Sequence, residues 1–146
     1  MFDFETAEQP ETLELGPLQK EWIARLRANP QRQMHGKLGR KDKEKDEYKA
    51  CCLGEAGLML GTLEWKEFGD SQFLALSNPG EGNASTLAAH EKLGLCTSAG
   101  SFWELHRLEG YKVFVSLADM NDNGYTWAQI ADYIEANPTN VFFKSV

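Results

Sequence analysis

The sequence has no apolar run near the roughly 20 residues that a membrane-spanning helix needs, which argues against a helical membrane protein. It has only three cysteines, an odd number without repeated spacing, so no disulfide framework is expected. Its acidic N-terminal segment lacks the basic stretch of a signal peptide. These absences together indicate a protein of the reducing cytoplasm.

The familiar sequence signatures of catalysis are also absent. The chain contains no nucleotide-binding P-loop, no dinucleotide-binding glycine pattern, no nucleophile elbow and no H-E-x-x-H zinc motif. The segment at 78–85 contains glycines and precedes an expected helix, so its amides could meet an anion. Because it lacks a lysine and a third glycine, we interpret it as a loop. No cofactor is expected, and catalysis is the less favoured class of function.

Charge is unevenly spread along the chain, whose net charge is −7. Residues 1–21 hold six acids and one base, and residues 50–146 hold twelve acids and five bases. Residues 25–49 hold nine bases and four acids, so one basic segment interrupts an acidic chain. Because phosphate affinity rests on clustered Lys and Arg, no direct binding of nucleic acid is expected. We interpret the part GKLGRKDKEKDEYK of the basic segment, at 36–49, as a solvated loop, and the alternative is a site for an anionic partner.

The chain does have enough apolar material for one core, since 42% of its 146 residues are hydrophobic and 16 are aromatic. Apolar spacing and helix-ending residues predict helices over 17–28, 48–61, 84–93 and 126–137. Strand patterns occur at 61–68, 71–77, 101–107 and 111–115, the last two forming a hairpin. The expected fold is α+β: a single compact domain over 16–146, with a small antiparallel sheet and three to four helices. A flexible acidic arm at 1–15 precedes the domain, and a charged loop at about 37–48 interrupts it.

The segment 117–138 begins like a calcium-binding loop. Asp119, Asn121 and Asn123 occupy the first, third and fifth ligand positions, and Gly124 occupies the sixth. The twelfth position, which needs a bidentate carboxylate, is Ile130. A single carboxylate before the glycine and no closing acid make a poor calcium site, so we expect no metal here.

Helix ends explain the same residues. Ser116 can cap a short helix whose first turn holds Asp119, and Gly124 can end that helix. Thr126 and Gln129 have the spacing of a capping box for a second helix. Beyond Gln129 the second helix offers little to base edges, so a DNA-reading helix–turn–helix is not expected. The sequence predicts a tight corner between two helices.

The cysteines and histidines invite a zinc or thiol-catalysis hypothesis. The adjacent Cys51 and Cys52 would diverge by about 100° on a helix and would not readily share one ion. Free cysteines are mostly buried and behave as small hydrophobes, so we interpret Cys51, Cys52 and Cys96 as core residues. A nucleophilic cysteine with His90 or His106 as its base is the alternative.

Three stretches in a fixed order resemble a group of small proteins of bacteriophages and prophages. They are LQKEWIARLRANPQRQMHGKL at 18–38, YKACCLGEAGLML at 48–60 and SLADMNDNGYTWAQIADYIE at 116–135, with HEKLGL at 90–95 between them. The group pairs a tryptophan-bearing first helix with C-C-L-G, then L-N-D-x-G and I-A-D-x-I. This chain departs from that pattern at Met120, in the charged insertion before Tyr48 and in the EAG after CCLG. The resemblance implies a phage genomic context and a bacterial cytoplasm, and it carries no activity.

Three functions are consistent with these features. The first is a small acidic accessory protein for host takeover or anti-defence, which binds a protein partner of host or phage origin and inhibits a nucleic-acid enzyme. The second is a small-ligand-binding protein or a cysteine-dependent enzyme. The predicted binding residues are Asn121, Asp122, Cys52, His90 and Trp103. The third is a structural or assembly protein, a homo-oligomer of this chain. If Asn121 and Asp122 only shape the corner, their side chains should bond to backbone amides.

Overall fold

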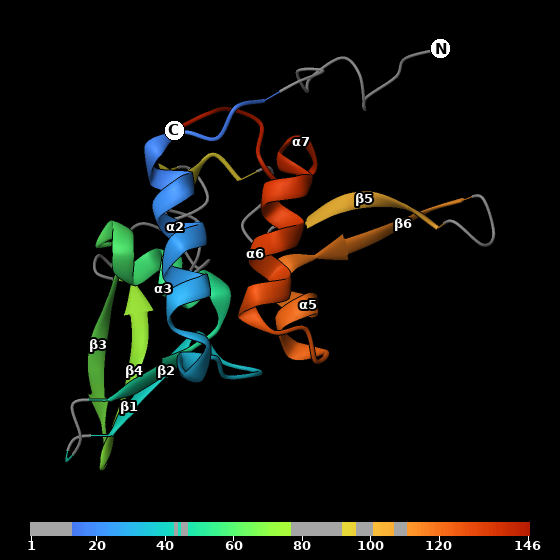
Figure 1. Cartoon of the computed structure of the whole chain (residues 1–146). Coiled ribbons are helices and arrows are strands. Elements are labelled where there is room, and N and C mark those ends of the chain that lie inside the picture. Colours follow the sequence, from blue (N-terminus) through green and yellow to red (C-terminus); the bar gives the residue numbers. More distant parts are fainter. Residues whose placement is uncertain (1–12, 43, 45–46, 77–91, 96–100, 107–110) are drawn as a thin grey trace.

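The computed structural model describes residues 13–42, 44, 47–76, 92–95, 101–106 and 111–146, with strand pairing alone for 101–106 and 111–115 (Figure 1). The helices are α2 (Pro17–Ala28), the 3-10 helix η1 (Pro30–Arg32), α3 (Cys52–Leu60), α5 (Leu117–Asp122), α6 (Trp127–Ala136) and α7 (Pro138–Val141). The strands are β1 (Gly39–Asp42), β2 (Tyr48–Ala50), β3 (Leu63–Phe68), β4 (Ser71–Leu76), β5 (Ser101–His106) and β6 (Tyr111–Ser116). The expected α+β class with a small antiparallel sheet is confirmed, and α7 is a short helix that the sequence did not predict.

The main sheet has four antiparallel strands in the order β2-β1-β4-β3. Strands β3 and β4 were expected, and Gly69 makes their tight turn with a positive φ of 64°. The interpretation of 37–48 as a charged loop is wrong for part of that segment, because β1 lies within it and pairs on both sides. Pairing with β4 supplies the hydrogen bonds and contacts that a strand of charged residues does not provide for itself.

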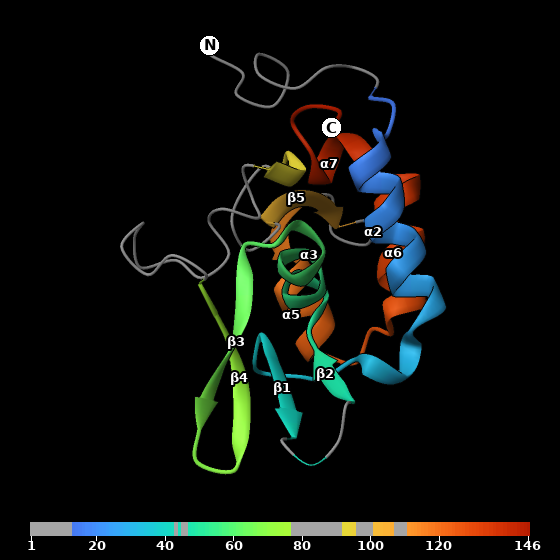
Figure 2. The same ribbon diagram turned by 90° about the vertical axis from the view of Figure 1, so that its left-hand side faces the viewer.

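The helices lie beside this sheet, and α3 lies between the sheet and helix α5 (Figures 1 and 2). Helix α3 contacts α2, α5, β2 and β3, while α2 packs along α6. The helix predicted over 48–61 is shorter, because its first residues form β2 instead, and Gly54 and Gly57 intrinsically weaken what remains. The structure gives the reason for both glycines. A Cβ at Gly54 would overlap the backbone oxygen of Leu38, and one at Gly57 would overlap the side chain of Leu63.

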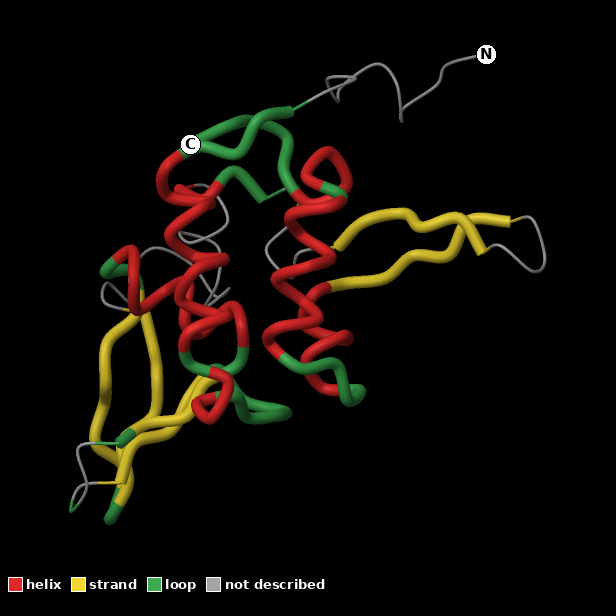
Figure 3. Tube along the Cα trace, viewed as in Figure 1, coloured by secondary structure: helices red, strands yellow, loops and turns green. Residues whose placement is uncertain are grey.

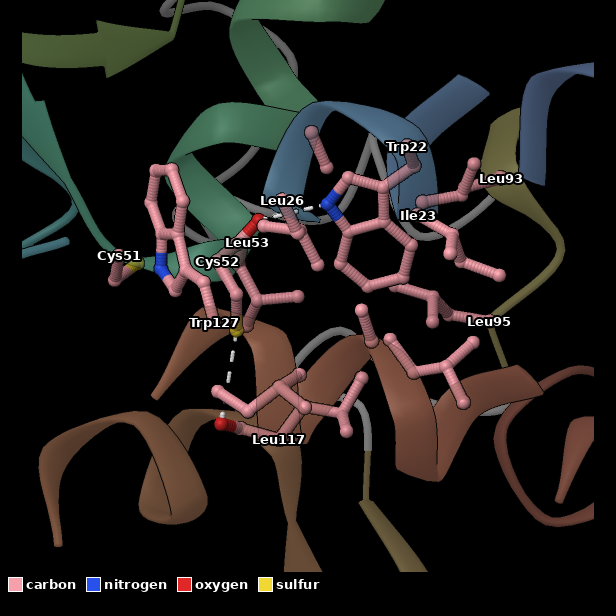
Figure 4. Close-up of a cluster of buried hydrophobic side chains, with 14 of the residues drawn as sticks. Trp22, Ile23, Leu26, Cys51, Cys52, Leu53, Leu93, Leu95, Leu117 and Trp127 are labelled. Carbon is pink, nitrogen blue, oxygen red and sulfur yellow. Dashed lines mark hydrogen bonds between the residues drawn. The ribbon is translucent and has the colours of Figure 1, made fainter. Parts of the chain in front are cut away.

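The core lies where α2, α3 and α6 meet (Figure 4). Trp22 is completely buried and donates its indole N–H to the backbone oxygen of Cys52 at 3.0 Å. Its ring meets Phe142 edge-on, with ring centroids 6.3 Å apart. Leu13 and Leu15 also pack against this core, so the described end of the predicted arm is attached to the domain. The rest of that arm, residues 1–12, lies outside the described residues.

The expected second hairpin is formed by β5 and β6, which pair from Ser101 opposite Ser116 to His106 opposite Tyr111. This two-stranded sheet projects from the helices, and β6 leads directly into α5 (Figure 3). Most of the helix expected at 84–93 lies outside the described residues. Gly94, the residue expected to end it, has a positive φ of 74°.

Candidate functional site

The predicted binding residue Asn121 lies near the end of α5 and is completely buried. Its side-chain oxygen accepts hydrogen bonds from the backbone N–H of Cys52 at 3.2 Å and from the indole N–H of Trp127 at 3.1 Å. Gln33 donates a third bond to the same oxygen at 3.2 Å, and the Asn121 amide donates to the backbone oxygen of Met34 at 2.7 Å. One side chain therefore joins α3, α5, α6 and the segment after η1.

Asp122, the next predicted binding residue, is exposed and also bonds to backbone. Its carboxylate accepts a hydrogen bond from the N–H of Gly36 at 2.8 Å. The backbone oxygen of Asn121 lies 2.6 Å from Nδ1 of His35. Both side chains thus bond to backbone amides, Asn121 to that of Cys52 and Asp122 to that of Gly36, as expected if they shape the corner. They hold the loop at 33–36 against the helical pair.

The helix caps expected at this corner are present. Ser116 accepts a hydrogen bond from the N–H of Asp119 at 3.0 Å. Thr126 accepts one from the N–H of Gln129 at 3.1 Å, and the Gln129 side chain accepts one from the N–H of Thr126 at 2.9 Å. Gly124 adopts a positive φ of 100° in the turn between the helices. The predicted corner is confirmed, together with its capping box.

Cys51 and Cys52 lie in the core at the start of α3 (Figure 4). The sulfur of Cys51 caps α3 by accepting the N–H of Gly54 at 3.3 Å, and the Cys52 thiol donates to the backbone oxygen of Leu117 at 3.7 Å. Burial raises the pKa of both thiols, and that of Cys52 by more. Both therefore stay protonated at neutral pH, the form that is a poor nucleophile. Their interpretation as core residues is confirmed, and Cys96 lies outside the described residues.

The remaining predicted residues are less fully described. His90 lies outside the described residues, as do the side chains of Trp103 and His106. In the backbone pairing, Trp103 lies opposite Phe114. Three of the five predicted binding residues, those of α3 and α5, therefore meet at one junction, and the hydrogen bonds described above account for their positions.

A charged cluster that the sequence reasoning missed surrounds Glu55 of α3, whose side chain is completely buried. Arg25 donates from Nε to this carboxylate at 3.0 Å, and the Tyr48 hydroxyl lies 2.9 and 3.1 Å from its two oxygens. Arg32 lies 3.9 Å from the same carboxylate and donates to the Tyr48 oxygen at 3.1 Å. Two guanidinium groups thus face one carboxylate, so the cluster carries one positive charge in excess.

Burial and the neighbouring groups together shift the pKa values of two members of the cluster. Burial raises the pKa of the Tyr48 hydroxyl, and its hydrogen bond to Glu55 raises it further, so Tyr48 stays a donor at neutral pH. Burial acts to lower the pKa of Arg25, but Glu55 and Tyr48 more than offset this, and the net shift is upward. In the sequence, Glu55 stands out as the one acid of an otherwise apolar helix. Because a Glu is almost never fully buried unless it is paired, such a position indicates a buried ion pair.

A groove of about 800 Å³ adjoins this cluster, between η1 and the strands β1 and β2. Its lining residues are Gln31, Arg32, Met34, Arg40, Asp42, Glu47, Tyr48 and Lys49. The guanidinium of Arg32 lies over the Tyr48 ring, 4.7 Å from its centroid, and the same ring packs against Trp65 at 5.4 Å. The basic segment, interpreted from the sequence as a solvated loop, therefore forms most of a concave surface.

A smaller hollow of about 420 Å³ lies between α2 and α6. At its edge Arg27 forms ion pairs with Asp132 at 2.8 Å and with Glu135 at 3.0 Å. Hydrogen bonding to Arg27 lowers the pKa of Glu135. Because these groups are exposed, the ion pairs contribute little to stability, and we assign this hollow to the surface seam between the two helices.

Within the described part of the chain, no three His, Cys, Asp or Glu side chains gather where they could hold a metal ion. None of the described helices combines the length and the apolar character needed to cross a membrane. Comparisons with protein-family models, with curated proteins and with solved structures found no match.

Proposed function

We propose that this protein is a phage-type accessory protein of the bacterial cytoplasm, which binds and inhibits a host or defence enzyme that acts on nucleic acid. The observation that carries the proposal is the charge of the corner between α5 and α6. Residues 117–137 contain four acids and no lysine or arginine. The four acids, all exposed, are Asp119, Asp122, Asp132 and Glu135. A basic groove that normally holds phosphates is the surface such a face complements.

The same corner also presents an exposed aromatic residue. The side chain of Tyr125 is 48% exposed in the turn between the two helices. Its backbone is nevertheless held at both ends, because its N–H donates to Met120 at 3.1 Å and its oxygen accepts from Gln33 at 2.6 Å. Tyrosine is common among the residues that dominate binding energy, and a rigid backbone lowers the entropy lost on binding. Tyr125 therefore has the properties of an interface anchor.

The four carboxylates differ in how much of their charge is already neutralised. Asp132 and Glu135 share the Arg27 guanidinium, whereas the described residues place no basic side chain in an ion pair with Asp119 or Asp122. The uncompensated charge therefore lies on α5, close in sequence to Tyr125. The stretch at 116–135 that resembles the phage proteins forms this same surface, so the resemblance and the charge support one interface.

The test is capture of partners from bacterial lysate by the tagged full chain, at low and at high salt, with identification by mass spectrometry. We expect a nucleic-acid enzyme that is lost at high salt, because exposed charges are screened, and whose activity falls when the protein is added. The variant with Asp119→Lys and Tyr125→Ala should lose the partner. Asp70→Lys, an equal change of charge in the turn between β3 and β4, should retain it.

Two results would overturn the proposal. One is the absence of any salt-sensitive partner, and the other is equal capture by the wild-type chain and the Asp119→Lys, Tyr125→Ala variant. Capture of further copies of this chain alone, with a defined oligomer in sedimentation, would instead favour the assembly role.

A further inference from the structure

The groove beside the Glu55 cluster has the dimensions of a small-ligand site. Its volume of about 800 Å³ lies within the range of ligand pockets, roughly 300–1,000 Å³. It is formed by η1, β1 and β2, and it includes none of the acidic residues of α5 and α6. A function of this groove would therefore be additional to the proposed binding of a partner by the α5–α6 corner.

Arg32 is held in this groove with part of its hydrogen-bonding capacity unused. Its guanidinium lies over the Tyr48 ring, and NH1 bonds to the Tyr48 hydroxyl and approaches Glu55. Among the described residues, its Nε and NH2 have no hydrogen-bond partner. An arginine that is fixed in place and presents two parallel N–H groups matches the two oxygens of a carboxylate.

The strands of the groove place two cations directly opposite each other. Arg40 of β1 is paired in register with Lys49 of β2. Like charges at such positions destabilise a sheet. Arg40 donates to Ser71 at 3.2 Å, and Lys49 forms no ion pair with a described residue. An anion bound in the groove would relieve the repulsion between Arg40 and Lys49. Anion binding therefore explains a pair of cations that does not stabilise the sheet.

The balance of charge selects the class of anion. Three cations and two acids line the groove, leaving one positive charge in excess. A monocarboxylate matches that excess, whereas a phosphate monoester carries roughly 1.5 to 2 negative charges near neutral pH and would be repelled more strongly by Asp42 and Glu47. Because the Tyr48 ring is already in contact with Arg32 and Trp65, it is not placed as a platform for a nucleotide base.

We propose that this groove binds a small organic monocarboxylate, whose two oxygens are paired with Nε and NH2 of Arg32. Lys49 and Arg40 add longer-range attraction, and Met34 offers apolar contact to the rest of the ligand. The buried Glu55 acts as a positioning residue, because it orients the Tyr48 hydroxyl that in turn holds Arg32.

The test is an NMR titration of the isotope-labelled full chain with benzoate, with its neutral analogue benzamide and with inorganic phosphate. Benzoate should produce saturable shifts at the Arg32 Nε–H and at the Lys49 amide, and benzamide should not. Arg32→Gln should raise the Kd for benzoate about tenfold or more, since it removes hydrogen bonds to a charged group. Arg32→Lys keeps the charge without the two parallel donors, so its Kd for benzoate should lie between those of the wild-type chain and Arg32→Gln.

The matched control is Arg27→Gln, which removes an arginine that pairs with α6 and does not line the groove. It should leave the Kd for benzoate unchanged. If Arg32→Gln does not fold, Lys49→Gln takes its place and should weaken benzoate about two- to threefold, as expected for a screened surface charge. Equal shifts with benzamide, tighter binding of phosphate than of benzoate, or an unchanged Kd in these groove variants would overturn the assignment.

Discussion

The substitution Asn121→Ala tests whether the α5–α6 corner is a structural junction. It removes a completely buried side chain whose oxygen accepts three hydrogen bonds and whose amide donates one to Met34. Alanine has no polar atom to replace it, and the partners come from three separate parts of the chain: the segment after η1, α3 and α6. The loss should therefore weaken the whole domain.

The size of the effect follows from the surroundings of each partner. The N–H of Cys52 and the indole N–H of Trp127 belong to buried residues, and leaving each without an acceptor costs about 1–2 kcal/mol. Gln33 and Met34 are half-buried, so water restores much of their bonding and each adds about 0.5 kcal/mol. We expect the free energy of unfolding to fall by about 3–5 kcal/mol, a large part of the roughly 5–15 kcal/mol of a typical domain.

Urea denaturation followed by tryptophan fluorescence measures this change, and thermal denaturation should show a Tm lower by roughly 10–15 °C. The neighbouring Asp122→Ala is the matched control. Its carboxylate is exposed and accepts the N–H of Gly36 at 2.8 Å and, more weakly, the Asn121 amide at 3.3 Å, so its loss should cost no more than about 1 kcal/mol. A loss below about 1 kcal/mol for Asn121→Ala would refute the reasoning and return Asn121 to the list of candidate binding residues.

Three further predictions concern α3. Glu55→Gln should lower the free energy of unfolding by about 2 kcal/mol in urea denaturation, because a partly exposed Arg25 loses its carboxylate, and no measurable change would contradict the buried pair. A thiol reagent at neutral pH should label Cys51 and Cys52 only on unfolding, since burial raises the pKa of both thiols; rapid labelling of the native protein would contradict their place in the core. Gly54→Ala should destabilise the domain by about 3 kcal/mol or more, because its Cβ would overlap the backbone oxygen of Leu38. An unchanged Tm would contradict this, since it would show that α3 and the backbone at Leu38 can move apart at little cost in free energy.

The features that the sequence predicted correctly depend on neighbours along the chain. Helix α2 starts at Pro17 and carries a four-residue apolar repeat, and the capping box of α6 uses Thr126 and Gln129. The turns at Gly69 and Gly124 need positive φ values, which glycine adopts without strain. Propensity, spacing and turn chemistry act over a few residues, so they can be read before the fold is known.

Strand β1 could not be predicted from its own residues. Its residues, Gly39–Asp42, are charged apart from the glycine and show no apolar alternation. Their extended form depends on pairing with β4, which lies about 30 residues further along the chain, and with β2. A strand whose stability comes from its neighbours in a sheet leaves little trace in its own residues.

The sequence by itself determined helices α2 and α6, the β3–β4 and β5–β6 hairpins, the capped corner and the uneven charge, because each depends on local spacing or composition. The tertiary structure alone decided the role of the polar residues within them. Asn121 became a buried junction and Glu55 the centre of an arginine–tyrosine cluster because their partners come from distant segments, as Arg25 does for Glu55. A buried polar group is stable only where the fold brings it a partner, and that meeting is a property of packing in three dimensions.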